Sequence, residues 1–454
     1  MMCHNAPSIS SNPSSGTLLS TRAKIIVILE KIQQGQSLAT LLNDLLGSVS
    51  PQDKGFAHEL LLGTLRQWWA LSRIGEGLIE REVSDKGVWA GLNIGLYQLL
   101  YMDTPDYAAI GATVEAIKQL NKGYGAGLVN AILRKVQKNP AKFHKKITKN
   151  HSLPNWLAQQ LKQDWGEYYD ELGQALRQSA PIFLRVNAQF STMADYAKLL
   201  NEQNINFDIV TTGFNDTQAI RLIDNVKITQ LPHFNDGWVS IQDLHAQLGG
   251  YILHELPLAK PITLLDTCTA PGGKLTHLLE LFHVEQFAQV VALDNDKERL
   301  KKVGENLERL QLQNKKVTLV CDDATTFVVD APFDVIVLDA PCTATGVIRR
   351  HPDIALLRTE HDVAQTVSLQ RQILANCWQN LAVGGYLLYI TCSLLKAENE
   401  QQIQVFLSKN QNADVVDFVL NLNNQIKRDI GYQCLPINPN GGDGFYYVLL
   451  NKRM

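Results

Sequence analysis

Apolar residues recur at every third or fourth position through the first third of the chain. The spacing is clear in "AKIIVILEKIQ", "GFAHELLLGTLRQWWALSRI" and "VWAGLNIGLYQLLYM", and it continues to Lys138 with a break at "NKGYGAG". This period is typical of amphipathic α-helices. Residues 21–150 are therefore predicted to form an all-helical domain, which should end at "NPAKFHKK" because Pro140 interrupts a helix.

Residues 151–236 show a mixed pattern. Helical spacing in "LPNWLAQQLKQDW" and "YYDELGQALRQ" gives way to the strand-like "APIFLRVN", and short mixed elements follow. We predict a small α+β domain that links its two neighbours.

From about Gly237 onward, short apolar runs alternate with helical segments. Five runs are typical of strands, namely "PITLLD", "QVVALD", "KVTLVCDD", "FDVIVLDA" and "GYLLYITC", and the first two are followed by the helical "LTHLLELF" and "DKERLKKVGENLERL". Strands that are apolar throughout and separated by helices are typical of a parallel sheet covered on both faces. Residues 237–454 are therefore predicted to form an α/β domain.

Composition narrows the class of protein. The chain has 454 residues, of which 45% are hydrophobic and 19% charged, as in ordinary soluble globular proteins. No apolar run approaches the roughly 18 residues that span a bilayer. Residues 1–20 lack the basic and apolar regions of a secretory signal, and their Ser, Asn and Pro content predicts a disordered tail. The 7 scattered cysteines include no CxxC pair, which argues against disulfides and a metal site and favours a cytoplasmic location.

The net charge of −3 is unevenly distributed. Residues 22–150 contain 17 Lys and Arg against 11 Asp and Glu, so the rest of the chain is acidic. Residues 134–149, "RKVQKNPAKFHKKITK", contain seven basic residues and no acid. Such a run is often only a solvated helix face, but it is also the electrostatic pattern of a surface that binds a polyanion.

The first strand of the α/β domain ends at Asp266 and leads into "TCTAPGGKL". This loop is not a Walker loop, because Cys268 stands where the first glycine should be and Leu275 replaces the hydroxyl residue. Gly272 and Gly273 instead permit a tight turn with close backbone approach, directly before the start of a helix.

Acidic residues follow four successive strands, at Asp266, Asp294, Asp323 and Asp339. A single acid in this position is often only a helix cap, whereas four in succession favour a ligand site at one edge of the sheet. Asp294, which follows Gly272 by 22 residues, is placed to bind ribose hydroxyls. The acidic edge disfavours a phosphate-rich ligand and suits a cationic nucleoside such as S-adenosylmethionine.

Two cysteines follow the fourth and fifth strands. Each of Cys342 and Cys392 alone would be interpreted as a small buried apolar residue, but together they lie beside the predicted methyl-donor site. A thiolate that adds to C6 of cytosine makes C5 nucleophilic toward a methyl donor, and later elimination releases the thiol. An acid is needed at N3 of the base to absorb the negative charge that develops there, and Asp339 is well placed for this. The residues alone leave open which thiol attacks.

Several motifs resemble those of the RNA (cytosine-5)-methyltransferase family, namely "DTCTAPGGK", "LDAPCTATG" and "TCSLLKAEN". "GVIRRHPDI" and "GGDGFYYVLL" resemble its Sun/Fmu branch, which acts on cytosine 967 of bacterial 16S rRNA. Residues 21–150 look like the family's helical NusB-like RNA-binding domain, and "APIFLRVN" and "GWVSIQDLHAQ" like its linking segments. The resemblance implies a Rossmann-like class I methyltransferase domain in residues 237–454. It also implies S-adenosylmethionine as cofactor and 16S rRNA as partner, in an enzyme expected to be a monomer that needs neither membrane nor metal.

The resemblance also implies roles for individual residues. Cys392 is the nucleophile, Cys342 assists product release, and Asp339 faces cofactor and base. Asp294 binds the ribose and Asp323 lies near the adenine. The cofactor loop comprises Cys268, Thr269, Ala270, Pro271, Gly272, Gly273 and Lys274. The residues predicted to contact RNA are Arg134, Lys135, Lys142, Lys145, Lys146, Arg185, Arg349 and Arg350.

Three positions qualify this assignment. Asp322 competes with Asp323 as the adenine-side acid, and placing Leu319 on the buried face of its strand favours Asp323. The cofactor loop reads Cys-Thr-Ala-Pro where the family usually has Cys-Ala-Ala-Pro. After Thr-Cys-Ser, Lys396-Ala397 replaces the common Pro-Glu, which puts a role for the first acid in doubt, while Glu398 and Asn399 remain.

Two other functions are considered. An rRNA-binding or antitermination-like module without catalysis would explain residues 22–150 but leave both thiols idle. A DNA methyltransferase would use Cys342 as its nucleophile, so comparing Cys392→Ser with Cys342→Ser distinguishes the two enzymes. In the RNA enzyme the target cytosine must leave its base stack, which favours an exposed loop as substrate.

Overall fold

The computed structural model describes residues 19–80, 83–149, 151–421 and 425–454. The described residues form two compact units, one before and one after residue 150. Of the tail predicted for residues 1–20, all but the last two residues lie outside the described part of the chain. No helix in the described ranges is both long and apolar enough to cross a membrane.

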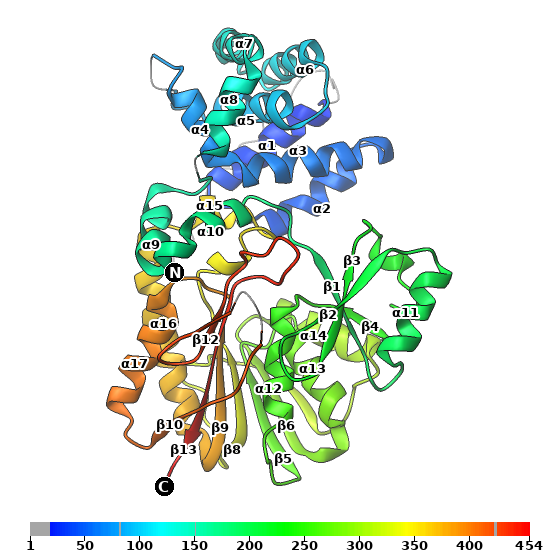
Figure 1. Cartoon of the computed structure of the whole chain (residues 1–454), viewed down its shortest axis with the longest axis vertical. Helices are drawn as coiled ribbons and strands as arrows, with labels where there is room; N and C mark the ends of the chain where they lie inside the picture. Colours follow the sequence, from blue (N-terminus) through cyan, green and yellow to red (C-terminus); the bar gives the residue numbers. More distant parts are fainter. Residues whose placement is uncertain (1–18, 81–82, 150, 422–424) are drawn as a thin grey trace, which may run out of the picture. The chain divides into compact units, whose positions relative to one another are not determined.

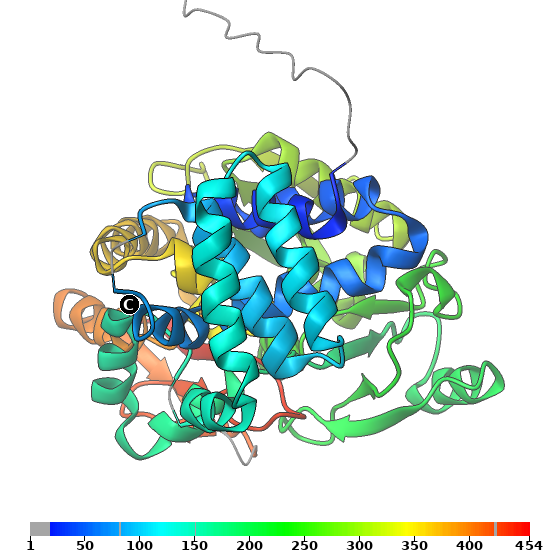
Figure 2. The same ribbon diagram turned by 90° about the horizontal axis from the view of Figure 1, so that it is seen from above.

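The first unit is all-helical, as predicted. Its α-helices are α1 (Thr21–Gln33), α2 (Leu38–Ser48), α3 (Lys54–Arg66), α4 (Trp68–Glu76), α5 (Lys86–Tyr101), α6 (Asp106–Gln119), α7 (Gly123–Gln137) and α8 (Pro140–Thr148). Helix α5 is central because it packs against α1, α3, α4, α6 and α7. A Cβ atom added at Gly91 or Gly95 would lie 2.6 Å from Ile117 of α6 or Leu133 of α7, so these glycines let the helices approach closely. Figure 2 shows α6 and α7 side by side.

Pro140 was expected to interrupt a helix at the end of this unit, but it is the first residue of α8, the last helix of the unit. The Asn139 side chain accepts a 3.1 Å hydrogen bond from the backbone N–H of Lys142 and so caps the helix. Proline suits this position since the first N–H of a helix has no intrahelical partner. The basic run therefore lies on the end of α7 and on α8. The break at "NKGYGAG" is also narrower than predicted, because α7 already begins at Gly123.

A small α+β region opens the second unit, as predicted. Its elements are α9 (Asn155–Trp165), α10 (Tyr169–Ala175), β1 (Ile182–Val186), α11 (Met193–Glu202), β2 (Phe207–Thr211), β3 (Gln218–Leu222) and β4 (Val239–Ile241). The strands form an antiparallel sheet of order β2-β3-β1-β4, and Tyr196 and Leu200 of α11 are buried in the same cluster as Leu184 and Ile220 of the sheet. Strand β4 lies beyond residue 236, the predicted end of this domain.

The remaining elements build a nine-stranded sheet with helices on both faces (Figure 1). They are α12 (Leu248–His254), β5 (Ile262–Thr267), α13 (Gly273–Phe282), β6 (Phe287–Asp294), α14 (Lys297–Arg309), β7 (Val317–Cys321), β8 (Phe333–Asp339), α15 (Ile354–Leu357), α16 (Glu360–Gln379), β9 (Leu381–Thr391), α17 (Glu400–Lys409), β10 (Ala413–Val416), β11 (Gln425–Lys427), β12 (Tyr432–Cys434) and β13 (Phe445–Lys452). The five predicted strands, β5 to β9, are parallel in the order β7-β6-β5-β8-β9. Strand β13 was not predicted, and it pairs antiparallel with β9.

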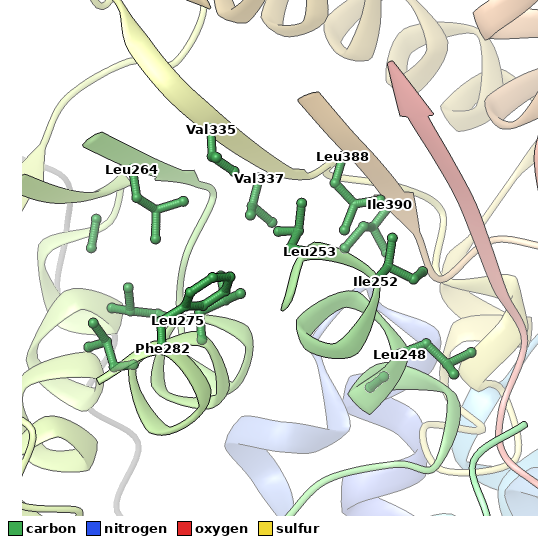
Figure 3. Close-up of a cluster of buried hydrophobic side chains, with 14 of the residues drawn as sticks. Leu248, Ile252, Leu253, Leu264, Leu275, Phe282, Val335, Val337, Leu388 and Ile390 are labelled. Atoms are coloured by element: carbon green, nitrogen blue, oxygen red, sulfur yellow. The ribbon is translucent and has the colours of Figure 1, made fainter. Parts of the chain in front are cut away.

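The central strands bury both of their faces. Leu264, Val337 and Ile390 point into a core with side chains of α12 and α13 (Figure 3). Their neighbours Leu265 and Leu338 point to the other face, where α16 and α17 pack. This alternation explains why these strands are apolar throughout, and it leaves their carboxyl ends as the place for polar chemistry.

Candidate active site at the carboxyl ends of the sheet

The structure brings Cys342 and Cys392 together, although they lie 50 residues apart in sequence. Strands β8 and β9 are parallel neighbours in which Asp339 lies opposite Ile390, so the loops that follow them lie side by side. The two Sγ atoms are 3.3 Å apart, and both side chains are partly exposed. A substrate at this edge of the sheet can therefore meet both thiols at once.

Close backbone contacts hold these two loops together. The N–H of Gly346 donates a 2.9 Å hydrogen bond to the carbonyl oxygen of Cys392, and the N–H of Gly444 donates one of 2.9 Å to the carbonyl oxygen of Gly346. A Cβ atom at Gly346 would lie 2.8 Å from the Cys392 carbonyl oxygen. Only glycine fits at this point of the "TATG" segment without moving the Cys392 loop.

The surroundings of the Cys342 thiol disfavour its ionisation. The hydrogen bond with the Cys392 sulfur, together with burial, raises the pKa of the Cys342 thiol well above its ordinary value. The thiolate form of Cys342 is therefore disfavoured while the two sulfur atoms are in contact.

Lys274 and Asp339 form an ion pair at the same edge. The Nζ of Lys274 lies 2.5 Å from Oδ2 of Asp339, and the Lys274 side chain is 13% exposed. Burial disfavours the charged ammonium, but the Asp339 carboxylate and the nearby Cys392 sulfur outweigh it and raise the pKa of Lys274. Lys274, which the sequence predicted to bind the cofactor, thus contributes a positive charge beside Asp339 and Cys392.

The predicted cofactor loop is a tight turn attached to the end of β6. The backbone N–H groups of Thr269 and Ala270 donate hydrogen bonds of 3.0 Å to the Leu293 carbonyl oxygen and of 3.1 Å to Oδ2 of Asp294. Gly272 has a φ of 92° and caps α13, a conformation that favours glycine. The loop residues 268–274 and Asp294 are therefore assembled in one place.

Three carboxylates crowd the ends of β5, β6 and β8. Asp266 is fully buried, and its Oδ1 has no hydrogen-bond partner within the described ranges. Burial, together with the nearby carboxylates of Asp339 and Asp294, raises the pKa of Asp266 from 3.8 to about 7. A bound cation would relieve this repulsion, so the residues fit the sulfonium of S-adenosylmethionine. No cluster of His, Cys, Asp and Glu in the described residues is arranged to hold a metal ion.

The prediction that favoured Asp323 over Asp322 rested on a buried Leu319, which the structure does not show. Leu319 was expected on a buried face, but it is 37% exposed because β7 is the edge strand of the sheet. Asp323 itself is exposed, and its Oδ1 accepts hydrogen bonds of 2.8 Å from both the N–H and the hydroxyl of Thr325. These bonds lower the pKa of Asp323. The choice between Asp322 and Asp323 as the adenine-side acid stays a prediction.

Arg185 does not fit its predicted role as an RNA contact. It is 2% exposed, and its guanidinium lies 2.7 Å from Oε1 of Glu280. It also donates a 2.9 Å hydrogen bond to the carbonyl oxygen of Gly273, at the start of α13. A charge enclosed in this way cannot reach a phosphate. Arg185 instead holds the end of the cofactor loop through its hydrogen bond to Gly273.

Arg349 and Arg350 also have carboxylate partners within the protein. Nε of Arg349, which is fully buried, lies 2.5 Å from Oδ1 of Asp443, and the same carboxylate pairs with Arg350. Arg350 also lies 2.7 Å from Oδ2 of Asp243. The "GVIRRHPDI" and "GGDGFYYVLL" motifs therefore bind each other and fix the loops behind the thiols.

The five basic residues predicted in the helical unit are all exposed. They are Arg134, Lys135, Lys142, Lys145 and Lys146. The four lysines among them, together with Lys149 and Phe143, line a cavity of about 600 Å³ on this unit. The cavity gathers positive charge at one place, as a phosphate-binding surface requires.

Glu398 contacts both thiol loops, although no role was assigned to it from the sequence. It is fully buried and accepts a 2.8 Å hydrogen bond from the N–H of Thr343, next to Cys342, and another from the hydroxyl of Ser393, next to Cys392. The signals in the sequence are its place in the "TCSLLKAEN" motif and its position six residues after Cys392, and neither indicates that it reaches the other loop.

Comparisons with known proteins agree with this architecture. A family model described as 16S rRNA methyltransferase RsmB/F matches residues 255–451. Models of the NusB family and of a ferredoxin-like domain of RsmF/B-like methyltransferases match residues 20–138 and 153–229. Ribosomal RNA small subunit methyltransferase B of Pasteurella multocida is 40% identical over 448 residues, which cover 96% of each chain. The chain belongs to the RsmB/F family of 16S rRNA methyltransferases.

Two further matches extend over the same length. The protein of that name from Serratia proteamaculans is 38% identical over 432 residues, covering 94% of this chain and 97% of its own. The crystal structure of PH0851 has a TM-score of 0.75 at 21% identity and covers 95% of this chain and 99% of that one, which shows a shared fold. As a member of the RsmB/F family, the protein is an rRNA methyltransferase, and S-adenosylmethionine is its methyl donor.

Proposed function

We propose that this RsmB/F-family enzyme methylates C5 of one cytosine of 16S rRNA, at the position of cytosine 967, through a covalent adduct with Cys392. The observation that carries the proposal is the 3.3 Å separation of the Cys342 and Cys392 sulfur atoms beside an acidic ligand site. The name of the Pasteurella multocida relative, ribosomal RNA small subunit methyltransferase B, supports the small-subunit RNA as substrate.

The reaction divides between the two thiols. The Cys392 thiolate adds to C6 of the flipped cytosine, and C5 becomes nucleophilic as a result. S-adenosylmethionine supplies the methyl group in electrophilic form. In the elimination that follows, a solvent water takes the C5 proton, the freed electron pair re-forms the C5–C6 double bond, and the C6–S bond breaks. Cys342, whose sulfur lies 3.3 Å from that of Cys392, assists this step by donating a hydrogen bond to the departing Cys392 thiolate.

Charged groups at the same edge support the base and the cofactor. Asp339, paired with Lys274 at 2.5 Å, is placed to hold a proton at N3 of the cytosine as negative charge develops there. We assign the turn formed by residues 268–274 to the methionine part of the cofactor. Asp294 would bind the ribose and Asp323 would lie on the adenine side.

RNA is held, in this proposal, by the exposed basic residues of α7 and α8. The cavity lined by Lys135, Lys142, Lys145, Lys146 and Lys149 offers a concentrated positive charge to the phosphate backbone. The target is an unpaired loop nucleotide, since flipping a base is least costly where it is not paired. One chain carries all of these residues, so the enzyme is proposed to act as a monomer.

Single-thiol variants test the mechanism. Cys392→Ser should abolish methyl transfer, whereas Cys342→Ser should accumulate a covalent enzyme–RNA adduct that survives on a denaturing gel. An adduct formed by Cys392→Ser and not by Cys342→Ser would reverse the two roles. Bisulfite sequencing of 16S rRNA from cells lacking the gene tests the target, because only the modified cytosine should lose its protection.

A further inference from the structure

We propose that Glu398 is a positioning residue that sets the separation of the two thiols by binding both of their loops. The inference rests on the proposed roles of Cys342 and Cys392 for its effect on catalysis. The position of the sulfur atoms, however, can be measured independently of any reaction on RNA.

The carboxylate of Glu398 joins the two loops directly. Its Oε1 accepts a 2.8 Å hydrogen bond from the backbone N–H of Thr343, and its Oε2 accepts one of 2.7 Å from the Thr343 hydroxyl. Oε2 also accepts a hydrogen bond from the Ser393 hydroxyl. Thr343 directly follows Cys342 and Ser393 directly follows Cys392, so one side chain restrains the residue next to each sulfur.

Additional hydroxyl contacts close the same network. The Ser393 and Thr345 hydroxyl oxygens are 3.2 Å apart, and the hydroxyl of Thr345 accepts a 2.9 Å hydrogen bond from the N–H of Leu394. Ser393 and Thr345 are fully buried. Loop residues at this edge can therefore shift only if several buried hydrogen bonds break together.

Glu398 is itself rigidly placed. The Tyr389 hydroxyl donates a 2.8 Å hydrogen bond to the Glu398 carbonyl oxygen. The neighbouring Asn399 accepts a 2.5 Å hydrogen bond from the hydroxyl of Thr391 and donates one of 2.9 Å to the carbonyl oxygen of Ser393. The backbone at Glu398 is thus anchored to β9, the strand that leads to Cys392.

Burying the Glu398 carboxylate carries a desolvation cost in free energy. Burial raises the pKa of Glu398, and the hydrogen bonds from Ser393 and Thr343, together with the charge of Arg358, work against that shift. An apolar residue of similar size would avoid the desolvation cost but could accept none of these hydrogen bonds. The geometry therefore fits a function in positioning better than one in stability.

The test compares Glu398→Ala and Glu398→Gln with Glu400→Gln as a matched control. The Glu400 carboxylate lies 2.6 Å from Nε of Arg428, and in the described chain it has no hydrogen bond to the residue next to either thiol. Diamide is added to the RNA-free enzyme, where it takes two hydrogens to become a hydrazine and joins two adjacent thiols as a disulfide. Peptide mass spectrometry then gives the rate at which Cys342 and Cys392 become linked.

We expect Glu398→Ala to slow this linkage at least about tenfold and to lower the kcat of methyl transfer by on the order of 100-fold, because small displacements of reacting groups have effects of that size. The KM for S-adenosylmethionine should not change. Glu398→Gln, which keeps one acceptor oxygen, should fall between wild type and Glu398→Ala, and Glu400→Gln should behave as wild type. If Glu398→Ala does not fold, Ser393→Ala, which removes one of the links, replaces it.

Linkage at the wild-type rate in Glu398→Ala would overturn the proposal, whatever happens to activity. A slower linkage with unchanged methyl transfer would support the positioning of the sulfur atoms by Glu398 and would instead refute the proposed roles of the two thiols.

Discussion

The indole Nε1 of Trp165 donates a 2.8 Å hydrogen bond to the carbonyl oxygen of Leu394, two residues beyond Cys392. Asp164, also in α9, accepts a 3.1 Å hydrogen bond from the backbone N–H of Lys396 in the same loop. Helix α9 belongs to the segment that opens the second unit, far from the thiols in sequence. It nevertheless braces the loop that carries the proposed nucleophile.

Replacing Trp165 by phenylalanine should therefore weaken both the fold and the reaction. Leu394 is fully buried, so its carbonyl oxygen would lose its donor, and the free energy of unfolding should fall by about 1–3 kcal/mol. Single-turnover methyl transfer should slow by about tenfold because the Cys392 loop gains freedom. Denaturant unfolding and quenched-flow assays measure the two effects. Gln159→Ala, at an exposed position of α9, is the control, and equal rates in all three proteins would contradict the prediction.

The buried carboxyl of Asp266 should make stability depend on pH. Its pKa is raised from 3.8 to about 7, first by burial and then by the carboxylates of Asp339 and Asp294. The folded state therefore binds more protons than the unfolded chain between these two values. The stabilisation is complete below the unfolded pKa and is lost as pH rises through the folded pKa, at up to about 1.4 kcal/mol per pH unit.

Asp266→Asn should flatten this dependence, as measured by denaturant unfolding from about pH 5 to 8 without cofactor. Asp417→Asn is the control, because its carboxylate is 71% exposed and pairs only with Lys427 among the ion pairs of the described chain. S-adenosylmethionine, as a cation, should favour the ionised form of Asp266 and bind more tightly as pH rises. An equal pH slope in wild type and Asp266→Asn would show that Asp266 does not titrate in this range.

The central strands could be predicted from the sequence. Both faces of such a strand are buried, so its residues are apolar throughout. Strands β5, β6, β8 and β9 and their order along the chain follow from continuous apolar runs. The prediction that Leu319 is buried was wrong, because β7 lies at the edge of the sheet and is less covered than the central strands. Strand β13 was not predicted, although its "FYYVLL" run is equally apolar.

Side-chain partners that lie far apart in sequence could not be predicted. Arg185 pairs with Glu280 and Arg349 with Asp443, and each arginine looks like a free positive charge until its partner is known. The contact of Glu398 with Thr343 could not be predicted for the same reason, because the two residues lie 55 positions apart. Family motifs mark the two thiols and include Glu398, but no local pattern indicates that Glu398 joins the two thiol loops.

Arg349 is expected to affect stability and not RNA binding. Arg349 and Asp443 are both fully buried, so Arg349→Ala removes one of the two arginine partners of Asp443, which keeps Arg350, and should lower the free energy of unfolding by about 1–3 kcal/mol. At a temperature where the variant stays folded, the salt dependence of its binding to 16S rRNA should match wild type. A shallower slope would mean that the guanidinium reaches a phosphate after all.

The lysines of α8 are expected to affect RNA binding and not stability. Lys142→Gln combined with Lys145→Gln should leave stability nearly unchanged, since both side chains are exposed. The plot of log binding constant against log salt concentration should become shallower by about one unit for each phosphate that the variant no longer neutralises. Lys118→Gln is the control, because this 56% exposed lysine of α6 lies outside the cavity and pairs with Glu115. If the double variant keeps the wild-type slope, the basic run is only a solvated helix face, and the RNA phosphates must bind elsewhere on the chain.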